Sequence, residues 1–285
     1  MDTVTDSGTS NAPSKRLVGK VAVVTGGARG IGAATARALA ESGAHVVIAD
    51  VLDGPGSELA ASIGCRYAHC DVSIESDVER AVRVAVDWKG RLDIMFNNAG
   101  VAGPDGSITC LETEQLASLV AVNLYGVVHG IKHAARAMIE GNNPGTIICS
   151  SSSAAVMGGL AAHAYTLSKG AILGLARSAA CELGAHGIRV NCVSPHGVPS
   201  EMLVGGYRRV LGDPHLQAED VRRIVGERGS LLRGRGASVE DVARGVMFLA
   251  SDDDSGFITG HNLVIDGGFT SANNQMSFIY HSHIN

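Results

Sequence analysis

Short apolar runs alternate along the chain with longer segments of helical pattern. The first apolar run, Val21–Val24, precedes a glycine-rich turn, and an alanine-rich segment then extends from Ala33 to Ser42. A second apolar run at 46–49 is closed by Asp50. A buried strand, a glycine turn, a helix and a second strand make a βαβ unit.

The alternation continues to the end of the chain. We predict further helices over 54–64, 78–88, 116–138, 165–183 and 239–249, and further strands over 67–70, 94–96, 146–149, 188–192 and 262–265. This order predicts an α/β fold with a doubly wound parallel sheet, the Rossmann fold, in a single domain over 15–270.

Three segments depart from this pattern. Residues 196–236 are rich in Gly, Pro and Arg, and we expect them to form a mobile segment that covers the substrate at the carboxyl ends of the strands. Residues 1–14 are polar, without the apolar core of a signal peptide or the arginines of a transit peptide, and predict a disordered lead. Residues 271–285 form a mainly polar C-terminal tail.

Composition narrows the possible partners. The chain has 285 residues, 45% hydrophobic and 18% charged, with a net charge of −5 and dispersed basic residues, so nucleic acid is not an expected partner. No apolar stretch approaches the ~20 residues that span a bilayer, which excludes a membrane partner and predicts a cytoplasmic protein. The six cysteines have no C-x-x-C pair and no metal-ligand spacing, so we expect reduced thiols and no metal.

The glycine turn carries the first chemical signal. Gly26, Gly30 and Gly32 are spaced G-x-x-x-G-x-G, which provides a sharp turn and a close backbone approach to a pyrophosphate at the helix N-terminus. A structural turn would also explain the glycines. Their position between a buried strand and a helix favours dinucleotide binding.

The acid at the end of the second strand predicts which dinucleotide is bound. Asp50 is placed to accept hydrogen bonds from both ribose hydroxyls and would repel a 2′-phosphate, so we predict NAD over NADP. Arg29, inside the glycine turn, is the one residue whose positive charge could compensate a 2′-phosphate and so favour NADP. Asp71 and Val72 follow the third strand and are expected near the adenine, although Asp71 could equally cap the next helix.

A helix pair carries the second signal. Tyr165 and Lys169 stand four residues apart, with Ser152 upstream in the serine run 150–153. A cation at ~4 Å in an effective dielectric of ~20 is worth roughly 4 kcal/mol, so we expect Lys169 to lower the tyrosine pKa by ~3 units and make it a proton shuttle. A solvated Tyr/Lys pair is the plain alternative, and the combination with the dinucleotide turn argues against it.

Together these motifs resemble the short-chain dehydrogenase/reductase family. The resemblance rests on TGGARGIG at 25–32, NNAG at 97–100, Asn123, Ser152, YxxxK at 165–169 and SPHG at 194–197, and it covers about residues 16–269. The sequence is most similar to plant members, the group of secoisolariciresinol, xanthoxin, borneol and momilactone-type dehydrogenases.

The resemblance implies a role for each catalytic position. Tyr165 would be the acid/base, Ser152 would polarise the substrate oxygen, Lys169 would lower the tyrosine pKa and bind the nicotinamide ribose, and Asn123 would hold a water in the proton relay. The further cofactor positions would be Ile31, Asn98, Gly100, Val122, Pro195, Gly197, Val198 and Ser200. The chain departs from the family at Ser200, where threonine is common, and at Glu201, where proline would often follow.

We therefore predict an NAD-dependent oxidoreductase that interconverts a secondary alcohol and a ketone on an apolar cyclic substrate, terpenoid or phenylpropanoid in type. An NADPH-dependent ketone reductase and a catalytically silent dinucleotide-binding regulatory protein are the alternatives. A serine hydrolase is disfavoured because the serine run lacks a G-x-S-x-G elbow.

Family members are commonly tetramers, which implies a homotetramer paired through the helices at 116–138 and 165–183. The expected substrate pocket comprises Val156, Met157, Leu160, His163, His196, Met202, Leu203 and Tyr207.

Overall fold

The computed structural model describes residues 16–232 and 234–272. The predicted lead at 1–14 lies outside the described residues, as does the predicted tail beyond residue 272. Within the described part of the chain, no helix combines the length and apolar character needed to cross a membrane.

Seven parallel strands form one sheet in the order β3-β2-β1-β4-β5-β6-β7. The order reverses between β1 and β4, and in open parallel sheets the crevice at such a reversal is where ligands bind. The strands are β1 (Val21–Thr25), β2 (His45–Asp50), β3 (Arg66–His69), β4 (Ile94–Asn97), β5 (Thr146–Ser150), β6 (Arg189–Pro195) and β7 (Asn262–Ile265).

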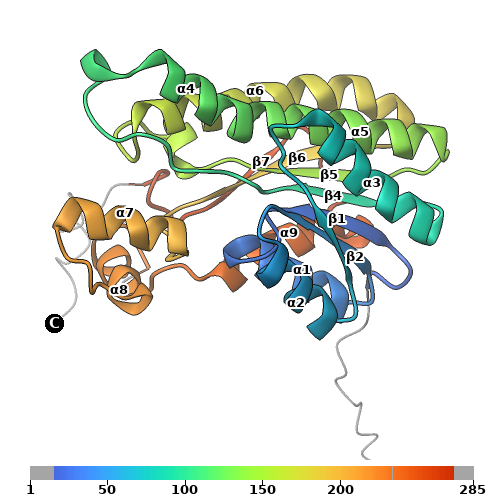
Figure 1. The fold of residues 1–285 in the computed structure, drawn as a ribbon, viewed down its shortest axis with the longest axis horizontal. Coiled ribbons are helices and arrows are strands. Elements are labelled where there is room, and N and C mark those ends of the chain that lie inside the picture. Colours follow the sequence, from blue (N-terminus) through green and yellow to red (C-terminus); the bar gives the residue numbers. More distant parts are fainter. Residues whose placement is uncertain (1–15, 233, 273–285) are drawn as a thin grey trace, which may run out of the picture.

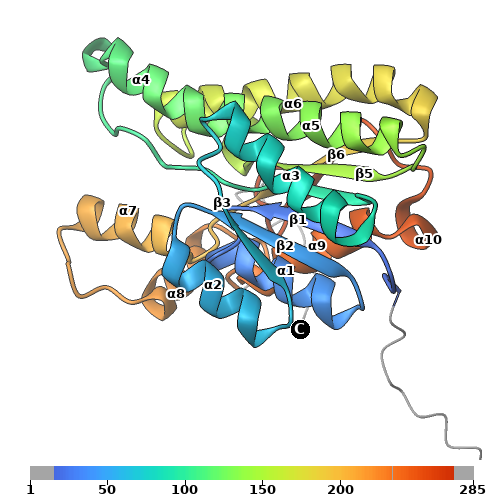
Figure 2. The same ribbon diagram turned by 45° about the vertical axis from the view of Figure 1, so that its right-hand side comes forward.

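Helices cover both faces of the sheet (Figures 1 and 2). One face carries α1 (Gly30–Glu41), α2 (Asp53–Ser62) and α9 (Val239–Ala250), and the other carries α3 (Glu75–Lys89), α5 (Gly126–Glu140) and α6 (His163–Leu183). Short helical pieces are at Ile108–Cys110, Ser153–Ala155, Gly184–His186 and α10 (Asp252–Ser255). The predicted single-domain, doubly wound α/β fold is confirmed.

Burial on both faces explains why the strands read as continuous apolar runs. All five residues of β1 are buried, with Val21 and Val23 in the core beneath α3 and α5, and Ala22 and Val24 in the core beneath α1 and α9. A parallel strand that is covered on both sides has no solvent face to make polar.

The predicted helix over 116–138 is a composite of three segments. It begins as α4 (Thr113–Val120), widens into one π-helical turn (Ala121–Tyr125) and continues as α5. Single π turns inside α-helices are frequent at functional sites, and this turn carries Asn123.

Residues 196–236 form two helices, α7 (Glu201–Leu211) and α8 (Ala218–Arg228), which lie beside the sheet in Figure 1. They share a small apolar core of Val204, Leu216, Val221 and Val225, so this segment has packing of its own. Its mobility stays a prediction.

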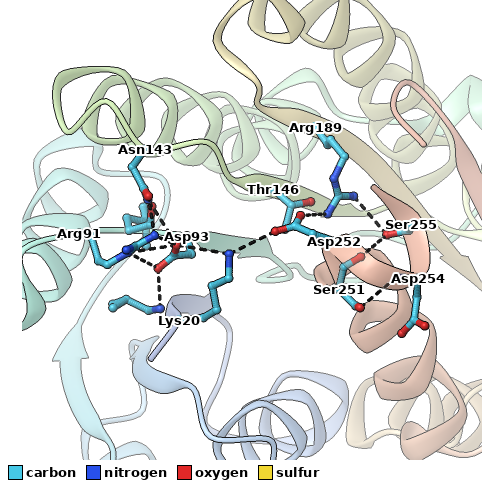
Figure 3. A network of polar contacts seen from close by, with 12 residues as sticks. Lys20, Arg91, Asp93, Asn143, Thr146, Arg189, Ser251, Asp252, Asp254 and Ser255 are labelled. Carbon is cyan, nitrogen blue, oxygen red and sulfur yellow. Dashed lines mark hydrogen bonds and ion pairs between the residues drawn. The ribbon is translucent and has the colours of Figure 1, made fainter. Parts of the chain in front are cut away.

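A polar network joins elements at the amino ends of the central strands (Figure 3). Buried Asp93 accepts a hydrogen bond from the Val21 amide at 2.9 Å and pairs with Arg91 and, at 3.8 Å, with Lys20. Lys20 also pairs with Asp252 at 3.1 Å, and Asp252 in turn pairs with Arg189 at 3.0 Å. The network thus connects β1, β4 and β6 to the start of α10.

Asp93→Ala should lower the free energy of unfolding by about 2–3 kcal/mol, because it leaves the buried Val21 N–H without an acceptor and Arg91 without its ionic partner. Urea denaturation measures the loss. Asp254→Ala, which removes the exposed partner of Arg16, is the control and should cost less than about 1 kcal/mol. Equal losses would show that Asp93 adds nothing beyond a surface ion pair.

Candidate functional site

The glycine turn packs too closely for side chains. A Cβ at Gly26 would lie 2.7 Å from the Ala99 Cα, and one at Gly32 would lie 2.1 Å from the Gly26 carbonyl oxygen. Gly26 and Gly30 also adopt left-handed φ values of +62° and +57°. The turn therefore brings bare backbone and the N-terminus of α1 to the edge of the groove, which fits the pyrophosphate of a dinucleotide.

Asp50 is fixed beside this turn. It is buried, and its two carboxylate oxygens accept hydrogen bonds from the Ala28 amide at 2.9 Å and the Leu52 amide at 3.0 Å. The next residues, Val51 and Leu52, are apolar and line the same groove. The carboxylate is thus held at the end of β2 with no basic residue immediately after it in the sequence.

Asp71 does not cap the next helix, because the N-cap of α3 is Ile74 and no side chain caps it, while its place near the adenine stays a prediction. It lines the groove, and its Oδ1 accepts hydrogen bonds from the Ser73 amide and hydroxyl at 2.9 and 2.7 Å. Those bonds fix the turn that leads into α3. One side chain therefore shapes this end of the groove and orders the chain behind it.

One large cavity of about 1150 Å³ runs along the carboxyl ends of the strands to α7 and α8. Gly32 lies beneath it, buried in the packing just described. The other expected cofactor positions line it: Gly26, Arg29, Gly30, Ile31, Asp50, Asp71, Val72, Asn98, Gly100, Val122, Tyr165, Lys169, Pro195, Gly197, Val198 and Ser200.

Ser152, Tyr165 and Lys169 come together in this cavity. Ser152 follows β5 and is hydrogen-bonded through its hydroxyl to the Tyr165 phenol. Lys169, one turn further along α6, is buried, and its Nζ donates to the Ser150 carbonyl at 2.8 Å. The same Nζ lies over the tyrosine ring, 5.6 Å from the ring centroid.

The expected effect of Lys169 on the tyrosine pKa is wrong for the free protein. Burial raises the pKa of Tyr165, and the hydrogen bond from Ser152 only partly opposes it. Burial also lowers the pKa of Lys169 to about 8. The ammonium faces the ring and the Ser150 carbonyl, so desolvation outweighs the attraction that we assigned to the pair.

Asn123 is buried behind the cavity and does not line it. Its Oδ1 accepts from the Val101 amide at 2.8 Å, and its Nδ2 donates to the Val101 carbonyl at 3.0 Å and to the Ser168 hydroxyl at 3.2 Å. Both amide protons are used within the protein, and the side chain ties the π turn to the chain after β4 and to α6. A water held by Asn123 stays a prediction.

The predicted substrate residues divide into two groups. Leu160, His196, Met202, Leu203 and Tyr207 line the cavity. Val156, Met157 and His163 do not, and all three are exposed to solvent. The short helical turn at Ser153–Ala155 carries the chain away from the cavity before it returns at Gly159 and Leu160.

A contact among three distant segments was not expected. The Ser153 hydroxyl is hydrogen-bonded to His196 Nδ1 at 2.8 Å, and the His196 ring stacks on Phe269 with centroids 4.6 Å apart. All three residues line the cavity. Burial lowers the pKa of His196, against the opposing charge of Asp266, so the ring is neutral near pH 7.

The fold and the groove define a class of protein, a dinucleotide-binding α/β oxidoreductase. A family profile described as Enoyl-(Acyl carrier protein) reductase matches residues 26–270. The chain is 60% identical to short-chain dehydrogenase reductase ATA1 of Arabidopsis thaliana, over 93% of this chain and 98% of that protein. It is also 46% identical to (+)-borneol dehydrogenase 2 of Salvia officinalis, over 92% of this chain and 93% of that protein.

Among solved structures, levodione reductase aligns with a TM-score of 0.80 and 28% identity, covering 90% of this chain and all of that one. The chain belongs to the short-chain dehydrogenase/reductase family of oxidoreductases, whose members bind a nicotinamide dinucleotide and act on small-molecule alcohols or ketones.

Lys169→Met should change how stability depends on pH. The lysine pKa is about 8 in the folded protein and ~10.4 in the unfolded chain, so below about pH 8 the unmodified protein carries the full cost of a buried charge, and that cost fades as pH rises toward 10. The variant's stability relative to the unmodified protein should therefore be higher at about pH 7 than at about pH 10, by roughly 2–3 kcal/mol. Denaturant unfolding at both pH values measures this. Lys89→Met, at an exposed lysine, is the control. The prediction would be contradicted if the stability difference between Lys169→Met and the unmodified protein were the same at both pH values.

Proposed function

We propose that the protein is an NAD-dependent dehydrogenase that interconverts a secondary alcohol and a ketone on an apolar cyclic substrate. The observation that carries the proposal is the position of Ser152, Tyr165 and Lys169 in the same cavity as the glycine turn and Asp50. A substrate oxygen at the tyrosine would face a proton acceptor beside a groove suited to a dinucleotide.

The residues divide the chemistry between them. In the oxidation direction, Tyr165 first loses its own proton to solvent and then, as a phenolate, takes the hydroxyl proton from the substrate while the Ser152 hydroxyl orients the same oxygen. A nicotinamide dinucleotide held by the glycine turn and Asp50 would supply the hydride acceptor. In the reduction direction the Tyr165 phenol gives its proton to the substrate oxygen. Lys169 supplies positive charge beside the phenol when the phenolate forms, and Asn123 holds the π turn and α6 in register behind it. A raised tyrosine pKa means that this charge is needed during proton transfer.

Preference for NAD over NADP is supported by Asp50 and its neighbours. The carboxylate accepts hydrogen bonds from backbone amides, lines the groove, and is followed by apolar Val51 and Leu52. A 2′-phosphate there would meet a like charge. Arg29 supports the second candidate, an NADPH-dependent ketone reductase, because it is the basic residue of the glycine turn.

An apolar substrate is supported by the cavity wall and by one relative. Leu160, Met202, Leu203 and Tyr207 give the cavity an apolar side, and the name (+)-borneol dehydrogenase points to a cyclic terpenoid alcohol for that protein. Ser153 and His196 add polar atoms to the same cavity, so we propose an oxygen-bearing ring rather than a plain hydrocarbon as the substrate. A cytoplasmic location remains part of the proposal.

Tyr165→Phe should reduce turnover by about 10²–10⁴-fold and leave NADH affinity within about twofold, since it removes the proton path and not the nucleotide site. Steady-state kinetics and calorimetric titration with NADH measure the two effects. A variant that keeps more than about a tenth of the rate would remove Tyr165 from the acid/base role. A silent regulatory protein would instead bind NADH and show no turnover before substitution.

The direct test is a panel of cyclic and aromatic secondary alcohols, including borneol, offered with NAD⁺ and with NADP⁺. We expect kcat/KM to be at least about tenfold higher with NAD⁺, a discrimination of about 1.4 kcal/mol, and Asp50→Ala to shrink that ratio mainly by weakening NAD⁺. Equal efficiency with the two cofactors would favour the ketone reductase. Asp53→Ala, which changes an exposed carboxylate of α2, is the control and should leave the ratio unchanged.

A homotetramer is supported by exposed apolar side chains on the outer helices. Tyr125, Val128 and Ile139 follow the π turn and α5 at helical spacing, and Leu167 lies on neighbouring α6. Such a surface is typical of helix pairing between subunits. Light scattering at micromolar concentration should give four subunits, and Val128→Glu should shift the protein to smaller species. A monomer in the unmodified protein would contradict the proposal.

A further inference from the structure

An ion pair links the cofactor turn to the helix that covers the cavity. Arg29 precedes the first turn of α1, and its guanidinium pairs with the Glu201 carboxylate in the first turn of α7. No other ionic partner of either residue occurs in residues 16–232 and 234–272. Both side chains are more than half exposed, so the pair can exchange with a charged ligand.

Glu201 is held in a defined place. The Ser200 hydroxyl caps α7 by accepting a hydrogen bond from the Leu203 amide, and a carboxylate in the first turn of a helix is favoured by the helix dipole. A Cβ at Gly30 would lie 3.6 Å from the Ser200 Cβ, so the start of α7 contacts the glycine turn itself. Glu201 therefore stands at the turn independently of Arg29.

The backbone of Arg29 lies near the acid proposed to bind ribose. The amide of its neighbour Ala28 donates to the Asp50 carboxylate at 2.9 Å. The long arginine side chain thus starts near the proposed ribose site and ends on α7. Directed toward Asp50 instead, it would place a guanidinium where a 2′-phosphate would lie.

We propose that Glu201 is a specificity-determining residue, which keeps NADPH affinity low by holding the Arg29 guanidinium on α7 and away from the adenosine ribose. The inference rests on the proposed dinucleotide site at Asp50. A 2′-phosphate must draw Arg29 away from Glu201, which leaves that carboxylate unpaired, whereas NAD leaves the pair intact. Glu201 is the residue at which the chain departs from the proline often found in its family, and the ion pair gives that departure a function.

The placement of α7 does not depend on Glu201 alone. Near the other end of the helix, Arg209 pairs with Asp105 at 3.2 Å. Val204, in the first half of α7, packs against Val221 and Val225 of α8. Removing the Glu201 charge should therefore free Arg29 and leave the cavity wall in place. The same second pair provides a matched control, since Asp105→Asn removes one carboxylate near α7 and the ion pair of Arg209 without touching Arg29.

A double-substitution cycle tests the inference without knowledge of the substrate. Calorimetric titration with NADH and with NADPH would compare the unmodified protein with Glu201→Gln, Arg29→Gln and the double variant. We expect Glu201→Gln to tighten NADPH about three- to fivefold, which corresponds to about 0.7–1 kcal/mol, and to change NADH less than about 1.5-fold. In the Arg29→Gln background the same substitution should change the NADH/NADPH ratio by less than about 1.5-fold.

Several results would overturn the inference. If Glu201→Gln changed the NADH/NADPH affinity ratio equally with and without Arg29, the effect would be a general one of charge. If it changed the affinities for both nucleotides equally, the ion pair would only hold α7 in place. A similar change of the NADH/NADPH affinity ratio in Asp105→Asn would also show that the effect comes from the placement of α7 and not from Arg29. Tighter NADPH than NADH in the unmodified protein would instead contradict the proposed NAD preference, while the cycle would still decide whether Glu201 acts through Arg29.

Discussion

The cofactor groove depends on how the ends of β1 and β4 are held together where the strand order reverses. The Asn98 side-chain amide donates to the backbone carbonyls of Thr25 and Gly26, both at 3.0 Å. In return, the Thr25 hydroxyl accepts from the backbone N–H groups of Asn98 at 3.0 Å and Ala99 at 3.2 Å. These bonds satisfy backbone groups that the two strands no longer share with each other. Because a Cβ at Gly26 would strike the Ala99 backbone, the contact requires glycine on one side and asparagine on the other.

A second set of hydrogen bonds links the chain after β4 to the reacting side chains. Asn123 binds both backbone groups of Val101, a short distance after the NNAG segment, and the hydroxyl of Ser168 next to Lys169. The π turn accommodates the buried amide within an otherwise continuous helix, from α4 to α5. The position of Lys169 is thereby coupled to the chain after β4, so the two halves of the site are built as one unit.

Local features of the site were predictable from the sequence, and features that join distant segments were not. The glycine turn, Asp50 and the helix pair at 165 and 169 each depend on spacing within one element, which a sequence displays directly. The contacts of His196 with Ser153 and with Phe269 join three segments, and no periodicity marks them. Val156, Met157 and His163 had suitable chemistry and spacing, but the turn after Ser153 directs them to solvent. The fold could be predicted from the alternation of apolar runs and helical segments. The π turn could not, because it depends on the distant residues that Asn123 contacts.

The pKa of Tyr165 shows why spacing alone misjudges electrostatics. The four-residue step does place Lys169 beside the ring, yet the same burial that forms the site disfavours both the phenolate and the ammonium. In the free protein near pH 7 the tyrosine is therefore a neutral phenol, while the lysine, with a pKa of about 8, still carries its charge at the cost of desolvation. A phenolate formed during proton transfer would change this balance, because each charge then has a partner in a medium of low dielectric constant, where attraction is strongest. The site thus pays its desolvation cost in the resting state and recovers part of it when the ion pair forms, which is the condition for stabilising a charge that exists only during the reaction.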